Sequence, residues 1–113
     1  MSTYTEHTPL SVVEGFEAAA FRLTQVARQL LAEHPGLPIN DIRPSVLAST
    51  HGVSAQLEIS VYDEGTGVRA WAEALGVAVT VDVHDVGTYA YEHHEATVER
   101  GGVTVHVGGT RRL

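Results

Sequence analysis

A run of alternating residues in the second half of the chain decides the fold: Val77-Ala78-Val79-Thr80-Val81-Asp82-Val83-His84. Valine alternates with small or polar residues, which is typical of a β-strand with one buried face and one solvent-facing face. A turn at residues 85–88 then leads into residues 89–99, and Arg100-Gly101-Gly102 turns the chain again into residues 103–107. These turns predict a three-stranded antiparallel meander at the C-terminal end.

The turns also predict how the three strands align. A two-residue turn at Gly101-Gly102 would place Val98 opposite Val105 and Ala96 opposite Val107 on one side, with Thr97 opposite His106 and Glu99 opposite Thr104 on the other. If the preceding turn pairs His84 with Tyr89, Asp82 faces Tyr91 and Thr80 faces His93. A slip of one residue would reverse the face on which each side chain lies.

The first half of the chain predicts a long helix and a β-hairpin. Ser11 and Glu14 have the spacing of a capping box, and Pro35 with Gly36 ends the helix near Glu33. An apolar stripe follows the helix through Phe16, Ala20, Leu23, Ala27 and Leu30, and Phe21 lies beside it as a possible contact for another chain. An extended connector is expected over residues 36–45, followed by strands 46–50 and 56–62 around Gly52.

A second, short helix is predicted over residues 68–75, with Trp71 on its apolar side and Gly76 closing it. The expected fold class is therefore α+β: a long N-terminal helix, a β-hairpin, a short helix and the three-stranded meander, with one antiparallel or mixed sheet and the helices on one of its faces. The 113 residues suit a single domain, residues 1–113, in which residues 1–9 are expected to be flexible.

Composition excludes several classes of protein. Cysteine is absent, so the chain has no disulfide framework and no cysteine-based metal site. The net charge of −7 is the wrong sign for direct nucleic-acid binding. Neither a membrane span nor a signal peptide is evident, and we expect a soluble, cytoplasmic protein. No Gly-x-Ser-x-Gly nucleophile elbow occurs, and Glu64-Gly65-Thr66-Gly67 lacks the lysine of a phosphate-binding loop, so an enzyme is the less favoured class.

The feature with the most chemical content is histidine, which occurs seven times. The predicted alignment gathers a set of imidazoles and carboxylates on one sheet face: Asp82, His84, His93, Glu95 and His106. Imidazole and carboxylate are ligands for zinc, nickel or ferrous iron, and these five residues are the candidate metal ligands. The simpler interpretation is an ordinary solvent-facing sheet surface that needs no cofactor, because no helical His pair around a glutamate is present.

Two hypotheses on function remain. The first is a small interaction or regulatory accessory module that binds a protein partner, which could be a second copy of itself. The second is a small-ligand-binding or metal-binding protein or enzyme, with zinc or nickel at the histidine face.

The segment Leu31-Ala32-Glu33-His34-Pro35-Gly36-Leu37-Pro38 and the later Val68-Arg69-Ala70-Trp71-Ala72-Glu73-Ala74-Leu75-Gly76-Val77 carry a resemblance. With the strands between and after them, they resemble small uncharacterised α+β proteins of GC-rich Gram-positive bacteria and their phages or mobile elements. The resemblance implies an accessory or regulatory role, and it carries no activity and no site residue to this chain.

Overall fold

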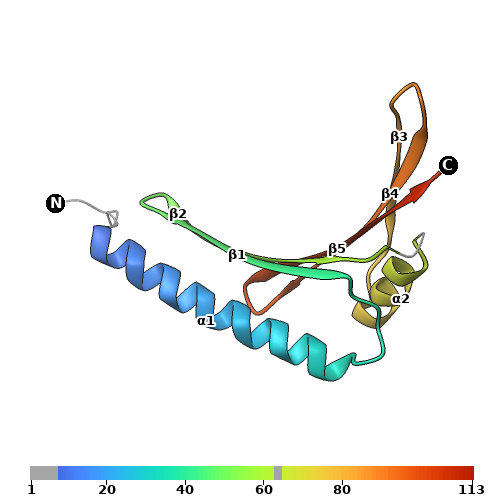
Figure 1. Cartoon of the computed structure of the whole chain (residues 1–113). Helices are drawn as coiled ribbons and strands as arrows, with labels where there is room; N and C mark the ends of the chain where they lie inside the picture. The colour runs from blue at the N-terminus through green and yellow to red at the C-terminus, as the bar shows by residue number, and fades with distance from the viewer. Residues whose placement is uncertain (1–7, 63–64) are drawn as a thin grey trace.

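The computed structural model describes residues 8–62 and 65–113, which form two helices and one five-stranded sheet (Figure 1). The elements in chain order are α1 (Pro9–Glu33), β1 (Asp41–Ser49), β2 (Gly52–Ser60), α2 (Thr66–Leu75), β3 (Thr80–Asp85), β4 (Ala90–Arg100) and β5 (Val103–Arg112). The α+β class, the long N-terminal helix and the short second helix therefore agree with the sequence.

The sheet is mixed and has the strand order β1-β2-β5-β4-β3. Neighbouring strands pair antiparallel except β2 and β5, which are parallel. The predicted meander is therefore matched only in part, because β5 also pairs with the hairpin and the three C-terminal strands form one side of a larger sheet. Parallel pairing needs a long crossover connection, which here contains α2, β3 and β4.

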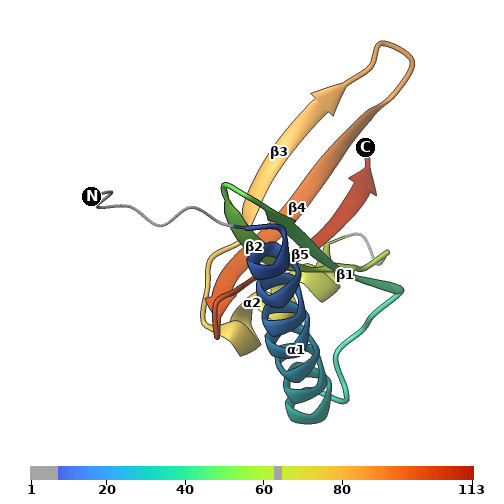
Figure 2. The same ribbon diagram turned by 90° about the vertical axis from the view of Figure 1, so that its left-hand side faces the viewer.

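Both helices pack on the same face of the sheet, and the core lies between them and the central strands. The long helix α1 covers β1 and β2, whereas α2 covers β4 and β5 (Figures 1 and 2). Leu57 of β2, Val105 of β5 and Trp71 of α2 are each 0% exposed. The indole Nε1 of Trp71 donates to the Pro38 carbonyl at 2.8 Å, so the one polar atom of this core residue is satisfied.

The start of α1 corrects the sequence prediction. Thr8 is the N-cap and Pro9 is the first helical residue, whereas Ser11 lies inside the helix, so the predicted capping box is wrong. The Ser11 N–H donates to Thr8 Oγ1 at 3.2 Å, and proline suits this position because its missing N–H would have no helical partner. Of the residues expected to be flexible, Thr8 and Pro9 belong to this cap, and residues 1–7 lie outside the described residues.

The buried stripe of α1 also differs from the predicted one. Its buried residues are Ala19, Leu23, Val26 and Leu30. Phe16, expected inside the stripe, is 46% exposed, and Phe21 is 64% exposed. Of the predicted stripe only Leu23 and Leu30 are buried, and Ala19 and Val26 complete the buried face of the helix.

The predicted connector over residues 36–45 is wrong at its C-terminal end, because β1 begins at Asp41 and includes Pro44. Proline lacks the N–H of a ladder residue, so within a sheet it is confined to edges and strand ends. β1 is an edge strand, and Pro44 faces Leu57 of β2 in the ladder. The position of β1 at the edge of the sheet therefore allows a strand through Pro44, which the residues around Arg43-Pro44 do not predict by themselves.

The strand predicted over residues 77–84 begins three positions later, at Thr80, and all six residues of β3 are exposed. Together with β4, this strand forms a hairpin that projects beyond both helices (Figures 1 and 2). We call residues 80–95 the β3–β4 arm. The molecule measures 59 × 37 × 21 Å and has a radius of gyration of 17.3 Å. A compact chain of this length has a radius of gyration of about 13 Å.

Candidate functional site

The sheet face opposite the helices is open and carries the polar side chains of the alternating strands. All four pairs predicted across β4 and β5 are confirmed: Val98 with Val105, Ala96 with Val107, Thr97 with His106, and Glu99 with Thr104. The apolar pairs are on the helix side, where Val105 and Val107 are 0% exposed. The remaining two pairs are therefore on the open face.

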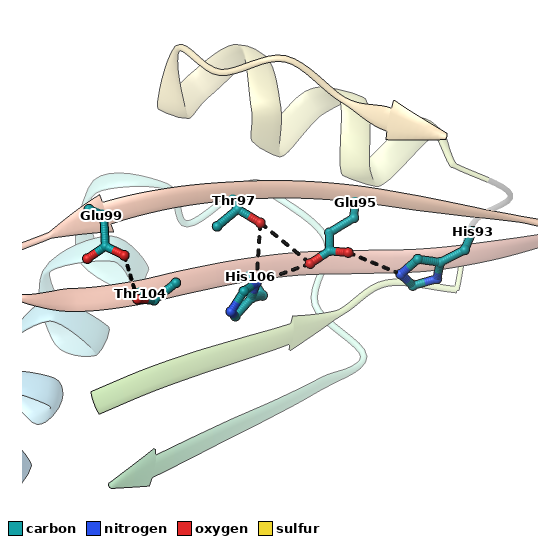
Figure 3. Close-up of polar contacts among 6 residues, drawn as sticks. All are labelled: His93, Glu95, Thr97, Glu99, Thr104 and His106. Atoms are coloured by element: carbon teal, nitrogen blue, oxygen red, sulfur yellow. Dashed lines mark hydrogen bonds and ion pairs between the residues drawn. The ribbon is translucent and has the colours of Figure 1, made fainter. Parts of the chain in front are cut away.

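Glu95 and His106 form the central contact of this face (Figure 3). His106 Nδ1 lies 3.1 Å from Glu95 Oε1 and 3.2 Å from the hydroxyl of Thr97. A carboxylate accepts hydrogen bonds only, so it favours a proton on Nδ1. In the neutral ring, this arrangement leaves the lone pair of His106 on Nε2, where it can accept a proton or bind a metal ion.

His93 approaches the same carboxylate from the other side. Its Nε2 lies 3.7 Å from Glu95 Oε2, so Glu95 is placed between two imidazoles (Figure 3). The side chains of His93 and Glu95 are 37% and 39% exposed. Since solvent reaches all of these groups, their mutual attraction is screened and contributes little to folding.

The other two predicted ligands lie farther along the arm. β3 and β4 pair with Asp82 opposite His93 and His84 opposite Tyr91, two residues away from the predicted alignment. A shift of two residues keeps every side chain on its predicted face, so all five candidates share the open face. However, the His84 ring stacks on Tyr91, with 5.0 Å between the ring centroids.

Residues 8–62 and 65–113 contain no group of three or more His, Asp or Glu side chains placed to hold a metal ion. The structure brings His93, Glu95 and His106 together and does not add Asp82 or His84 to that group.

Beside His106, the open face is hollowed into a cavity of about 350 Å³. Its lining includes His93, Glu95, His106 and three residues that the sequence analysis did not single out: Arg43, Glu58 and Tyr62. The parallel pairing of β2 with β5 places Glu58 next to His106, and Arg43 Nη2 lies 3.3 Å from Glu58 Oε2. The alternation of polar Gln56, Glu58 and Ser60 with apolar residues is typical of a strand with one solvent-facing side, but it does not identify the neighbouring strand.

Gly108 and Gly109 help to shape the cavity, which both residues line. A Cβ added to Gly108 would lie 3.4 Å from His93 Cε1, in ordinary van der Waals contact. A Cβ added to Gly109 would instead collide with the Val61 carbonyl oxygen. Gly109 is therefore required by packing, whereas Gly108 leaves space on the open face.

His94 lies on the helix side and is 2% exposed, so its ring belongs to the interior. Its Nε2 lies 3.5 Å from Glu92 Oε1, and a Cβ on Gly65 would come within 2.9 Å of its Cε1. Gly65 also has φ 93° as the N-cap of α2. Both facts explain why glycine occupies this position in the segment that superficially resembles a phosphate-binding loop.

No family model, curated protein or solved structure matches this chain. Neither described helix is long and apolar enough to cross a lipid bilayer. A function for the chain must therefore be argued from its own surfaces, of which the open face and the arm are the two candidates.

Proposed function

We propose that this chain is a protein-interaction module that assembles with a second copy of itself. The observation that carries the proposal is the exposure of β3 along its whole length: all six of its residues are exposed, including Val81 at 44% and Val83 at 63%. Both are valines of a regular strand, yet no described element packs on the outer edge of β3.

An open strand edge presents unpaired N–H and C=O groups and is therefore a template for another strand. Proteins that avoid such pairing place proline, lysine or a bulge on the edge. The opposite edge, β1, contains Pro44, whereas β3 (Thr80–Asp85) contains no proline, and its only charged residues are Asp82, Asp85 and, when protonated, His84. This contrast supports β3 as the edge through which the chain associates.

The test is the solution mass of the full chain over a wide concentration range, measured by sedimentation velocity. We expect a shift from the 12.1 kDa monomer toward twice that mass as concentration rises. Val83→Lys should abolish the shift, because lysine charges the edge without disturbing the core. The control is Leu47→Lys on β1, an exposed apolar position at 73%, which should leave the shift intact. A mass that stays at the monomer value throughout would refute the proposal.

A second candidate function is the binding of a small ligand or a divalent metal ion at the open-face cavity. The contact between His106 Nδ1 and Glu95 favours it, since a histidine held by a carboxylate is the usual arrangement of a metal-binding imidazole. With Glu58 alongside, the site offers an imidazole nitrogen and a carboxylate to zinc or nickel.

This candidate is tested by titrating untagged protein with zinc or nickel and following the melting temperature. Specific binding predicts a rise in melting temperature that His106→Asn removes and that the control His84→Asn on the arm retains. No rise with either ion, or equal loss in both variants, would dismiss a metal site at His106.

A further inference from the structure

We infer that β3 pairs antiparallel with β3 of a second copy, about a two-fold axis that passes beside Val83. The inference rests on the proposed self-assembly and adds to it the strand, the direction and the alignment. It follows from three features of the arm: the backbone groups left open, the faces of the side chains, and the charges at Asp82 and His84.

The open backbone groups can be identified from the turn of the arm. The Val86 N–H donates to the Tyr89 carbonyl at 3.0 Å, so residue 86 directs its backbone polar groups toward β4. In an antiparallel ladder, successive residues direct these groups to opposite sides. Val81, Val83 and Asp85 therefore direct their N–H and C=O groups outward, toward an incoming strand.

The side-chain faces restrict how two copies can align. Residues directly opposite each other in a sheet share a face, so odd-numbered residues of β3 must face odd-numbered residues of the partner. An alignment of Val83 with the partner's Val83 meets this requirement. It also lets the outward N–H and C=O groups of the two strands form hydrogen bonds with each other. It also places the two exposed valine side chains in contact on the helix side of the sheet.

Charge selects this alignment over its neighbours. With the axis at Val83, Asp82 faces the partner's His84, and the symmetry repeats this contact. These positions are the non-hydrogen-bonded pairs of the ladder, where opposing side chains lie closest. An imidazole N–H can donate to the carboxylate in either charge state of the ring.

The neighbouring alignments lack this contact. Moving the axis to residue 82 opposes two aspartates, and moving it to residue 84 opposes two histidines. Like charges directly opposite each other destabilise a strand pair, which disfavours the opposed aspartates, and two opposed histidines lack a carboxylate partner. Only the alignment about Val83 therefore matches carboxylate with imidazole on both sides of the axis.

The His84 ring already has a contact within the arm. It stacks on Tyr91, and the Arg112 guanidinium lies over Tyr89, 5.1 Å from the ring centroid. The stacking on Tyr91 limits the freedom that His84 would lose on association. The edge is only six residues long, so we expect a weak dimer that forms at high protein concentration.

Cysteine cross-linking locates the axis directly, because the chain contains no cysteine. The three full-length variants are Asp82→Cys, Val83→Cys and His84→Cys, each oxidised under mild conditions and analysed on a non-reducing gel. Opposed residues of a hydrogen-bonded pair have Cα atoms about 5.5 Å apart, which a disulfide can span. We expect a covalent dimer from Val83→Cys above the yield of the other two. A higher yield at residue 82 or 84 would overturn the alignment.

A charge exchange tests the same alignment without cross-linking. His84→Asp should weaken dimerisation about tenfold, since two pairs of aspartates then oppose each other. Adding Asp82→Lys to that variant should restore the wild-type affinity or exceed it, because each lysine faces an aspartate. With the axis at residue 82 or 84, the double variant would instead oppose like charges and fail to recover.

The outcomes separate this inference from the proposed function. Wild-type dimers whose affinity is unchanged in every arm variant would overturn pairing through β3 and leave self-assembly standing. A wild-type chain that remains monomeric would overturn both. Circular dichroism spectra of each variant establish that the fold is retained, and residues 82 and 84 are exposed.

Discussion

The helix-covered part of the sheet and the β3–β4 arm are built from the same kind of sequence and have opposite environments. Val103, Val105 and Val107 alternate with polar residues in β5 and are each 0% exposed. Val81 and Val83 alternate with polar residues in β3 and are 44% and 63% exposed. Alternation therefore identifies a strand, but it does not say whether another layer covers the apolar face.

The difference arises from the reach of the helices. α1 packs on β1 and β2, and α2 packs on β4 and β5. Four of the five described strands are therefore in contact with a helix. β3 lies at the edge beyond them. Burial of apolar area is what stabilises one region and is missing from the other. Two predictions test this contrast directly, and two more concern the faces of β5 and the end of α1.

The largest effect is expected in the core at Trp71. Trp71→Ala removes a ring that is 0% exposed and a hydrogen bond to Pro38, and it should destabilise the fold by about 3–5 kcal/mol. Tyr89→Ala, on the arm and 45% exposed, should cost below about 1 kcal/mol. Urea unfolding followed by circular dichroism measures both. Similar losses of unfolding free energy in the two variants would mean that Tyr89 stabilises the fold as much as a core residue does.

A matched pair of valines sharpens the comparison. Val105→Ala should cost about 2 kcal/mol because it removes buried methyl groups and leaves a cavity. Val83→Ala should change the free energy of unfolding by less than about 0.5 kcal/mol. Both are measured at a concentration below any self-association. A large loss at Val83 under these conditions would contradict the exposure of β3.

Two adjacent glycines of β5 test the covered and open faces of one strand. Gly109→Ala should cost about 1–3 kcal/mol, because its Cβ would meet the Val61 carbonyl and lie 3.2 Å from Val68 Cγ2. Gly108→Ala has room on the open face and should be tolerated. Thermal denaturation of the two variants should give a lower melting temperature for Gly109→Ala. Equal melting temperatures would contradict the prediction.

The smallest effect concerns Glu33, where α1 meets the end of β4. Hydrogen bonds from Gln29 and then Arg100, at 2.9 and 3.2 Å, hold the pKa of Glu33 below its ordinary value of 4.5. A carboxyl with a lowered pKa stabilises the fold above its unfolded pKa, and the contribution is lost as pH falls through the folded pKa. Glu33→Gln should therefore be slightly less stable than wild type near neutral pH, with the difference vanishing in acid. The urea midpoints of wild type and Glu33→Gln, measured from neutral to acidic pH, test this prediction. A stability difference that grows as the pH falls would contradict it.

Local residue patterns were sufficient for the elements that local chemistry specifies. The alternation in residues 103–107 and the Gly101-Gly102 turn gave the alignment of β4 with β5 because a two-residue turn fixes its own register. The same approach missed the alignment of β3 with β4 by two residues, because the turn between them can be placed at more than one position along the sequence. The shared face of Glu95, His93 and His106 was nevertheless predictable, since a shift of two residues preserves the face.

The sequence by itself determined the α+β class, the end of α1 at Glu33, the β4–β5 pairing and the polar character of one sheet face. Only the tertiary structure decided that β2 and β5 pair in parallel, which places Arg43, Glu58 and Tyr62 around His106. Only the tertiary structure also left β3 uncovered. The physical reason is that periodicity and turn chemistry act between near neighbours. The partner of a strand edge and the cover of a sheet face instead depend on how distant segments pack together.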